Sequence, residues 1–188
     1  IAVSIARSSE MRVIVTVRNA KALDKLRREL DRAGLYGNEI VAHPGAAPLP
    51  YADHLFNLVV DPSDTLDKQE LKRILRPSDG IGLTGPNLEK THSKEALEGG
   101  GEWTHLYADP GNTSCSQDQK VGVDLSLQWF GRPGPERLLD RHHRSVSPLS
   151  KNGFLFIPGN ERIFGVDTYN GAVLWETEVP ESRRIAIM

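Results

Sequence analysis

Two aspartates follow an apolar run in the first half of the 188-residue sequence, at a place where carboxylates often do chemistry. Asp61 and Asp64 come directly after HLFNLVV. If that run is a strand of a parallel sheet, both carboxylates lie at its carboxyl edge, where open α/β sheets bind ligands. The same residues in VVDPSD are also typical of a turn followed by a helix cap. We favour this second interpretation.

Three possible metal ligands, His105, Asp109 and Cys115, lie close together further along the sequence. Their uneven spacing matches no familiar ligand pattern, so we predict no metal site.

A basic stretch follows within PERLLDRHHRSVSPL, and its members are Arg137, Arg141, His142, His143 and Arg144. Adjacent side chains on an extended segment point to opposite sides, so the paired histidines cannot readily share one ion. We expect a solvated or anion-contacting rim, with a catalytic histidine as the alternative.

The composition and charge of the sequence exclude several classes of protein. A formal net charge of -2 and a pI near 6.3 give no electrostatic basis for binding nucleic acid or an anionic membrane. No run approaches the roughly 20 apolar residues of a membrane span. The single cysteine excludes an internal disulfide framework and a multi-cysteine metal site. Because the sequence opens on Ile1 without a Met and stops in SRRIAIM without a closing turn, we expect a fragment of a longer protein.

Strand and helix patterns alternate in the first half. The strand candidates are RVIVTV, EIVAH, HLFNLVV and GIGLTG. IAVSIAR looks like the last turns of a helix, and a second helix begins at the cap Asn19 and stops at Gly34. A third helix, DKQELKRILRP, ends near Pro77. This order predicts a mainly parallel, partial doubly wound sheet covered by helices.

The segment AGLYGNEIVAHPGAAPLPYADHLFNLVV, with ELKRILRPSDGIGL after it, resembles the back part of a class I S-adenosylmethionine-dependent methyltransferase. The resemblance covers about half of the chain and implies a Rossmann-like sheet. The glycine loop of that family would precede Ile1. Its ribose-binding acid corresponds to Val17 or Arg18, and its adenine-binding acid to Ala46, none of which can accept those hydrogen bonds. We therefore expect a degenerate cofactor site.

Turn-rich sequence separates this half from the last quarter. The stretch NLEKTHSKEALEGGGEW becomes Gly-rich and predicts an exposed linker. From Ser145, four short strand patterns follow, SVSPLS, FLFIP, RIFGV and AVLWETEV. The pairs Asn152-Gly153 and Asn170-Gly171 supply the positive φ angles of tight turns. Four antiparallel strands of this kind are the unit of one β-propeller blade.

The stretch VDTYNGAVLW resembles the repeat of pyrroloquinoline-quinone-type (PQQ) β-propellers, and its motif residues are Asp167, Gly171 and Trp175. Upstream, LQWFGRPG looks like the outer strand that closes such a ring. Together with the methyltransferase-like part, the EWTH to DPGN connector and the basic DRHHRS, the chain is similar to quinoprotein-like propeller proteins of bacterial envelopes. We expect Asp167 to accept amide hydrogens across its turn and Trp175 to stack on a neighbour. Both are then blade architecture and not ligand contacts.

The resemblance implies three domains: residues 1–90 as a truncated methyltransferase-like α/β domain, 91–125 as a linker, and 126–188 as the first propeller blade. It also implies a periplasmic or cell-envelope location. The implied partners are the remaining blades of the parent chain and a protein or polymeric ligand. We expect a binding role and no cofactor in this fragment. The alternatives are a PQQ-dependent dehydrogenase, with PQQ and Ca²⁺ in the full protein, and a methyltransferase that uses S-adenosylmethionine.

Overall fold

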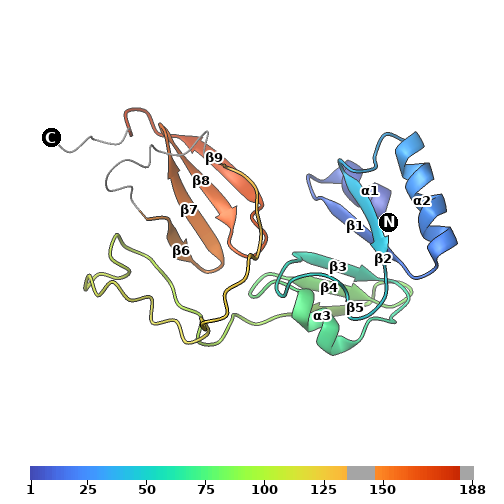
Figure 1. Cartoon of the computed structure of the whole chain (residues 1–188), viewed down its shortest axis with the longest axis horizontal. Coiled ribbons are helices and arrows are strands. Elements are labelled where there is room, and N and C mark those ends of the chain that lie inside the picture. Colours follow the sequence, from blue (N-terminus) through green and yellow to red (C-terminus); the bar gives the residue numbers. More distant parts are fainter. Residues whose placement is uncertain (135–146, 183–188) are drawn as a thin grey trace. The chain divides into compact units, whose positions relative to one another are not determined.

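The computed structural model describes residues 1–134 and 147–182, and Figure 1 traces its helices and strands. The chain forms two compact units, Ile1–Pro50 and Tyr51–Met188. It has mixed α/β content, with several sheets of which one is a four-stranded antiparallel sheet. The domain limits expected near residues 90 and 125 stay predictions.

The first unit is a small α/β structure. Its elements are α1 (Ala2–Ser8), β1 (Val13–Val17), α2 (Ala20–Arg32) and β2 (Ile40–Pro44). The two strands are parallel, with Val13 opposite Ile40. Asn19 caps α2 as predicted, because its side chain accepts a hydrogen bond from the amide of Ala22. Gly34 follows the helix with a φ of +69°, a conformation that glycine adopts without steric cost.

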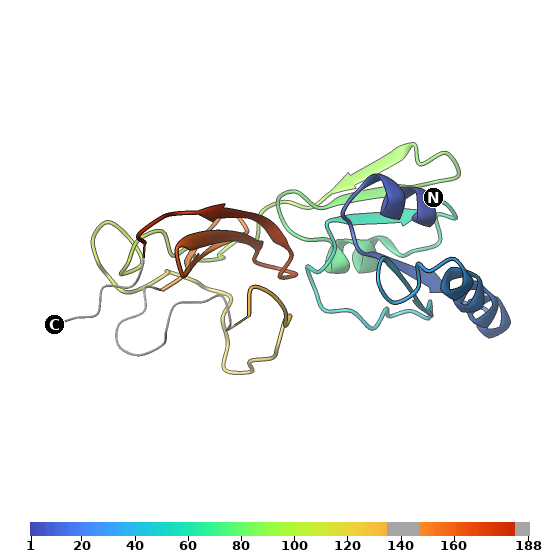
Figure 2. The ribbon, with the colours of Figure 1, turned by 90° about the horizontal axis from the view of Figure 1, so that it is seen from above.

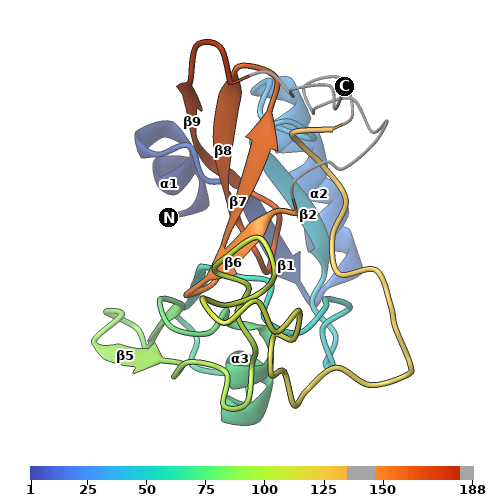
Figure 3. The same ribbon diagram turned by 90° about the vertical axis from the view of Figure 1, so that its left-hand side faces the viewer.

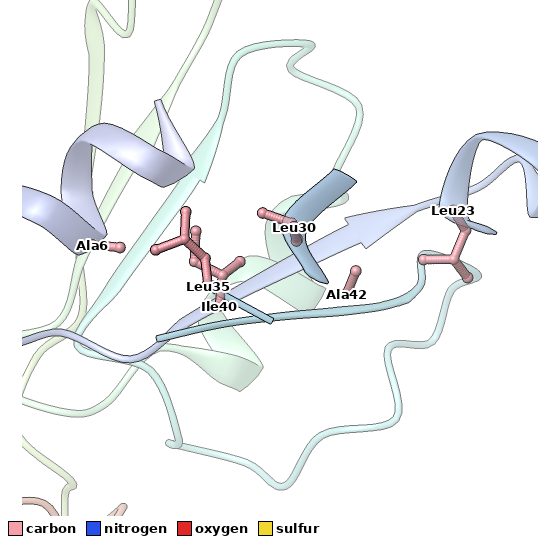
Figure 4. Close-up of a cluster of buried hydrophobic side chains, with 6 residues drawn as sticks. All are labelled: Ala6, Leu23, Leu30, Leu35, Ile40 and Ala42. Atoms are coloured by element: carbon pink, nitrogen blue, oxygen red, sulfur yellow. The ribbon is translucent and has the colours of Figure 1, made fainter. Parts of the chain in front are cut away.

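The core of the first unit comes from both helices and from β2 (Figure 4). Its buried members are Ala6, Leu23, Leu30, Leu35, Ile40 and Ala42. Leu23 and Leu30 lie on the predicted apolar stripe of α2, and Leu26 of the same stripe packs against the cluster. Full burial of one such leucine or isoleucine stabilises the fold by about 1.5–3 kcal/mol. The helix is therefore held by packing of this stripe.

The second unit begins with a three-stranded sheet. Its elements are β3 (Leu58–Asp61), α3 (Lys68–Ile74), β4 (Ile81–Thr84) and β5 (Lys90–Ser93). β3 and β4 are parallel, whereas β5 is antiparallel to β4. Leu71 of α3 lies over Gly82 of β4, where a methyl group on the glycine would stand 3.1 Å from a leucine methyl. The helix thus covers this sheet closely.

The parallel pairing expected from the sequence is confirmed, but the single parallel sheet is not. β1 pairs only with β2, and β3 and β4 belong to a different sheet. Strand patterns indicate that a segment is extended and say nothing about which edge it joins, because that choice depends on long-range packing. The doubly wound, Rossmann-like assignment therefore belongs to the proposals below.

The four predicted strands of the last quarter are present and form an antiparallel meander, seen face-on in Figure 3. They are β6 (Leu149–Lys151), β7 (Phe154–Gly159), β8 (Arg162–Asp167) and β9 (Val173–Glu178). Asn152 and Gly153 both have positive φ, as expected. In the last turn only Gly171 does, so the expectation for Asn170 is wrong; its side chain is held by hydrogen bonds instead.

Between β5 and β6, the described residues 94–134 and 147–148 have almost no regular structure. Figure 2 shows their yellow-green to orange part, about residues 100–134, as loops beside the four-stranded sheet. Trp103 makes one isolated antiparallel bridge to Ser150 of β6. The outer strand expected at LQWFGRPG, residues 127–134, is absent from the described structure, because the stretch makes side-chain contacts in place of a ladder.

Candidate functional site

The two methyltransferase-family positions lie at one edge of the first sheet. Val17 ends β1 and stands directly opposite Pro44, which ends β2. The amide of Gly45 donates to the carbonyl of Val17 over 3.1 Å, and Ala46 is the next residue. The sequence thus placed both positions at the carboxyl edge of neighbouring strands. Neither side chain has a hydrogen-bonding atom, and that of Val17 packs against the core.

Asp61 forms a turn at the end of β3, in agreement with the interpretation favoured from the sequence. Its carboxylate accepts hydrogen bonds from the amides of Thr65 and Leu66, at 2.7 and 2.8 Å, and from the hydroxyl of Ser63. Partial burial raises the pKa of Asp61, but these hydrogen bonds outweigh it and leave the pKa below its ordinary value. The carboxylate therefore serves the local backbone.

Asp64 is not the helix cap that the sequence suggested. It forms an ion pair with Lys90, whose hydrogen bond lowers the pKa of Asp64. The cap of α3 is Asp67, which accepts hydrogen bonds from the amides of Gln69 and Glu70. An aspartate three residues before a glutamate, just ahead of an apolar stripe, was the signal that identified this start. The helix thus begins where DKQELKRILRP predicts, and the correction concerns the capping residue alone.

A buried polar cluster lies beneath the turn between β8 and β9, and we call it the turn cluster: Asn57, Arg76, Asp167, Tyr169 and Asn170. Asp167 ends β8 and is 0% exposed. One carboxylate oxygen accepts the amide hydrogen of Tyr169 at 2.9 Å, which confirms the predicted bond across the turn. The other accepts a hydrogen bond from the side chain of Asn57 at 2.9 Å and lies 3.4 Å from Nε of Arg76.

Arg76 is the cation of the turn cluster and is only 4% exposed. Its guanidinium carbon lies 5.8 Å from the ring centres of both Phe154 and Tyr169, within cation–π range. Asp79 stands 3.4 Å from Nη1 and is mostly exposed. Nε and Nη2 have no well-directed hydrogen-bond partner. The charge of Arg76 is therefore balanced mainly by Asp167 and by the two rings.

Asn170 completes the connection to the three-stranded sheet. Its side-chain amide donates to Oδ1 of Asn57 at 2.6 Å and to the carbonyl of Leu55 at 3.1 Å. Its own Oδ1 accepts the amide hydrogen of Ala172, which closes the turn. These residues are more than one hundred positions apart in the sequence. The turn cluster thus fastens the turn of the four-stranded sheet to the start of β3 and the end of α3.

Sequence reasoning missed Asn57 and Arg76. Each is a single polar residue inside an apolar run, HLFNLVV and RILRP. A polar side chain in a run that becomes buried needs a partner, and this was the available signal. The identity of the partner carries no local signature.

A histidine–lysine pair lies beside the turn cluster. Nζ of Lys94 is 2.6 Å from Nδ1 of His54 and also donates to the carbonyls of Lys72 and Leu75 near the end of α3. The ring of His54 contacts that of Tyr169 edge-on. Burial and the charge of Lys94 lower the pKa of His54, and burial lowers the pKa of Lys94. Neutral His54 therefore accepts a hydrogen bond from the ammonium group of Lys94.

Gly171 of the repeat motif makes room for a tryptophan that the sequence did not single out. Its φ is +72°, and a Cβ atom there would overlap the ring of Trp129. The indole of Trp129 donates from Nε1 to the carbonyl of Thr168 over 2.8 Å. The side chain of Gln128 donates to the carbonyl of Tyr169. The stretch expected to be an outer strand therefore docks by its side chains on the β8–β9 turn.

Trp175 lies across a glycine of the neighbouring strand. Gly165 is its register partner in β8, and a Cβ atom there would overlap the indole. The ring of Phe156, one strand further, lies 6.1 Å away between centres. Trp175 remains 40% exposed. One side of the indole thus packs on the sheet, and much of the rest faces outward.

The connector residues proposed as possible metal ligands make only local contacts. His105 is paired with the hydroxyl of Thr104, and Asp109 accepts hydrogen bonds from Thr113. Cys115 is an exposed free thiol. Within residues 1–134 and 147–182, no group of three or more histidine, cysteine or acidic side chains is placed to hold a metal ion. The basic residues Arg137, Arg141, His142, His143 and Arg144 lie outside the described residues.

Comparison with known proteins gives no assignment. No family model, no curated protein and no solved structure matches this chain. In the part of the chain that the structure describes, no helix is both long and apolar enough to cross a bilayer.

Proposed function

We propose that the chain has a binding role as part of a quinoprotein-like (PQQ-repeat) β-propeller protein of the cell envelope. In this proposal the four-stranded sheet is the first blade and the preceding α/β part is a degenerate methyltransferase-like domain. The observation that carries the proposal is that two residues of the repeat motif, Asp167 and Trp175, have different surroundings. Asp167 is fully occupied by internal contacts, whereas Trp175 presents an indole on the face of the sheet.

One face of the four-stranded sheet, on which Trp175 is 40% exposed, supports the proposed stacking role. Phe156, Gly165 and Trp175 are register partners on three adjacent strands, so their side chains share one face. Phe154 lies on the same face of β7, and its ring neighbours that of Phe156. Sheets pack face to face through such aromatic and aliphatic side chains. Further blades of the parent chain are the partners that this face suits best, and a protein or polymeric ligand would bind the assembled propeller.

Two aspartates, and the two positions compared with the cofactor site of methyltransferases, support a binding role over catalysis. Val17 and Ala46 offer no acceptor for the hydroxyl or amino groups of S-adenosylmethionine. Asp61 and Asp167 are engaged by backbone and side-chain donors of the chain itself. Neither a methyltransferase nor a PQQ-dependent dehydrogenase is favoured by a specific observation in the described residues.

Calorimetry tests the cofactor side of this proposal. S-adenosylmethionine, and separately PQQ with Ca²⁺, would be titrated into the chain. We expect no saturable heat, and a dissociation constant near 1 μM, about -8 kcal/mol of binding, would overturn the proposal.

A dye experiment tests the exposed face. An apolar fluorescent dye such as anilinonaphthalene sulfonate is expected to bind the native chain and to bind Trp175→Ser more weakly. Leu106→Ser is the control, because Leu106 is 50% exposed and lies in the connector. Trp175→Ser should also lower the free energy of unfolding by no more than about 1–2 kcal/mol, because the indole packs on the sheet by one side only. A loss of several kcal/mol would assign Trp175 to the core and refute its role as a contact for a partner.

A further inference from the structure

An extended run of apolar side chains is left exposed in the second unit. We call residues 121–127 the apolar segment. Every second residue of this segment is a large apolar one, and so is Phe130 beyond it; their exposed fractions are Val121 74%, Val123 95%, Leu125 80%, Leu127 78% and Phe130 92%. Alternation with a period of two is the pattern of a β-strand with one apolar face. In the described structure no strand or bridge pairs with this segment.

The apolar segment is held at both ends. Before it, the carboxylate of Asp118 accepts the amide hydrogens of Lys120 and Val121, each at 2.7 Å. After it, Gln128 and Trp129 are bound to the β8–β9 turn. Between these anchors a side chain added at Gly122 would meet open space. The segment is thus presented to solvent by fixed ends.

The outer edge of β9 could pair with a strand such as the apolar segment. β9 is the last strand of the four-stranded sheet, as Figure 3 shows, and pairs through one edge with β8. All six of its residues are exposed. Trp175 and Thr177 lie on one face of β9, and a register shift between Gly165 and Val166 places Val173 on the other face. Among the described residues no strand pairs with this outer edge, and an exposed edge of this kind is a template for strand addition.

We propose that the apolar segment of one copy of this chain adds as an antiparallel strand to the outer edge of β9 in a second copy, and that the exchange is reciprocal. A second copy is the occupant because it brings both complementary parts, a free strand and a free edge. The two contacts are then related by a two-fold axis and close the assembly at a dimer.

Charge disfavours one register of this pairing. When Val123 stands opposite Trp175, the other facing pairs are Lys120 with Glu178, Val121 with Thr177, and Gly122 with Glu176. This register pairs opposite charges at Lys120 and Glu178. A shift by two residues that sets Leu125 against Trp175 instead brings Asp124 against Glu176, and like charges facing each other destabilise a sheet.

The area is sufficient for a specific dimer. An apolar side chain of this size contributes about 60–120 Å² when it is buried. Four of them on each of two segments bring roughly 480–960 Å², and the strand surfaces that they cover bring a similar amount. The total reaches the range of about 1,200–2,000 Å² found in stable interfaces.

Sedimentation velocity on the 188-residue chain, at about 1–100 μM, tests the proposal directly. We expect a concentration-dependent dimer. Val123→Lys should raise its dissociation constant about tenfold or more, because it places a charge in the apolar face of both strand pairs. Ser126→Lys is the matched control, since it adds the same charge to the opposite face of the segment and should leave the dimer intact.

A charge exchange tests the register. Lys120→Glu and Glu178→Lys should each weaken the dimer, and the double variant should restore it. A chain that stays monomeric throughout this range overturns the proposal, and so does a dimer that Val123→Lys leaves unchanged. The contact is made through the backbone edge of β9 and sets Val123 beside Trp175, whereas the proposed stacking role uses the face of the sheet. Sedimentation reports the first contact and dye binding by the monomer reports the second, so either proposal can fail alone.

Discussion

Replacing Asp167 by asparagine is the sharpest test of the turn cluster. Asp167→Asn keeps the shape of the side chain and leaves one oxygen for the amide of Tyr169. It removes the negative charge that faces Arg76, and it sets an NH₂ group against the NH₂ group of Asn57. Both partners of the ion pair are buried, so solvent cannot take over the lost interaction.

The expected loss of stability is large. Removing one partner of a buried ion pair costs about 3–5 kcal/mol, because the remaining charge is left without compensation. The electron-rich faces of Phe154 and Tyr169 reduce this cost only slightly, since a cation–π contact contributes about 0.5–2 kcal/mol. Compared with a total stability of about 5–15 kcal/mol for a folded domain, this is a large fraction.

Urea unfolding followed by tryptophan fluorescence measures this loss of stability in the second unit, which contains the turn cluster. The three tryptophans, Trp103, Trp129 and Trp175, all lie in the second unit. The first unit is therefore silent in this signal. A fall in the urea midpoint without a change in slope would indicate a change in stability alone.

Two further variants decide whether the ion pair is responsible. Asp79→Asn removes the exposed neighbour of Arg76 and should cost less than about 1 kcal/mol. Arg76→Met added to Asp167→Asn should cost less than the sum of the two single variants, by about 1–3 kcal/mol, because it removes the uncompensated charge. If Asp167→Asn costs no more than Asp79→Asn, the reasoning is refuted.

Two other predictions concern the glycine and the histidine near the turn. Gly171→Ala should destabilise the second unit more than Gly134→Ala does and should shift the indole N–H resonance of Trp129; both glycines have φ near +70°, but only at Gly171 would a Cβ atom meet a ring. Equal losses of stability would show that the tryptophan contact is unimportant. The second unit should also lose stability as the pH falls below about 6.5, because the pKa of His54 is lower in the folded chain than in the unfolded chain, which therefore binds the proton first. His54→Asn should flatten this part of the midpoint-against-pH curve and His105→Asn should not; an unchanged curve for His54→Asn would contradict the assignment.

Local elements were predictable because their signals lie within a few residues. Asn19 and Gly34 bound α2 as expected, since a cap and a positive φ are properties of one turn of chain. The helix beginning at Asp67 was also expected, but its cap was assigned to Asp64, whereas Asp67 itself caps α3. Such errors of a few residues arise where several acidic residues compete for one cap.

The contacts of the candidate site were not predictable in the same way. Asp167 was identified through its own turn, but its partner Arg76 lies ninety-one positions earlier in the sequence and carries no periodic signal. Trp129 was assigned to a strand because LQWFGRPG resembles the outer strand of a propeller, and it docks on Gly171 by its ring instead. A strand-like sequence pattern indicates that the backbone prefers an extended conformation, but it does not identify the surface against which the segment packs.

By itself, the sequence determined most of the helices and strands, several of the caps and turns that bound them, and the antiparallel meander of its last quarter. It missed β5, which lies in the stretch expected to be an exposed linker. These follow from interactions between residues close together in the chain, where backbone preference and side-chain periodicity act directly. Only the tertiary structure decided that the parallel strands divide into two sheets, that Arg76 and Asp167 share one buried site, and that residues 121–127 remain without a partner strand. Each of these depends on which distant surfaces exclude water from one another, and that is a property of the folded chain as a whole.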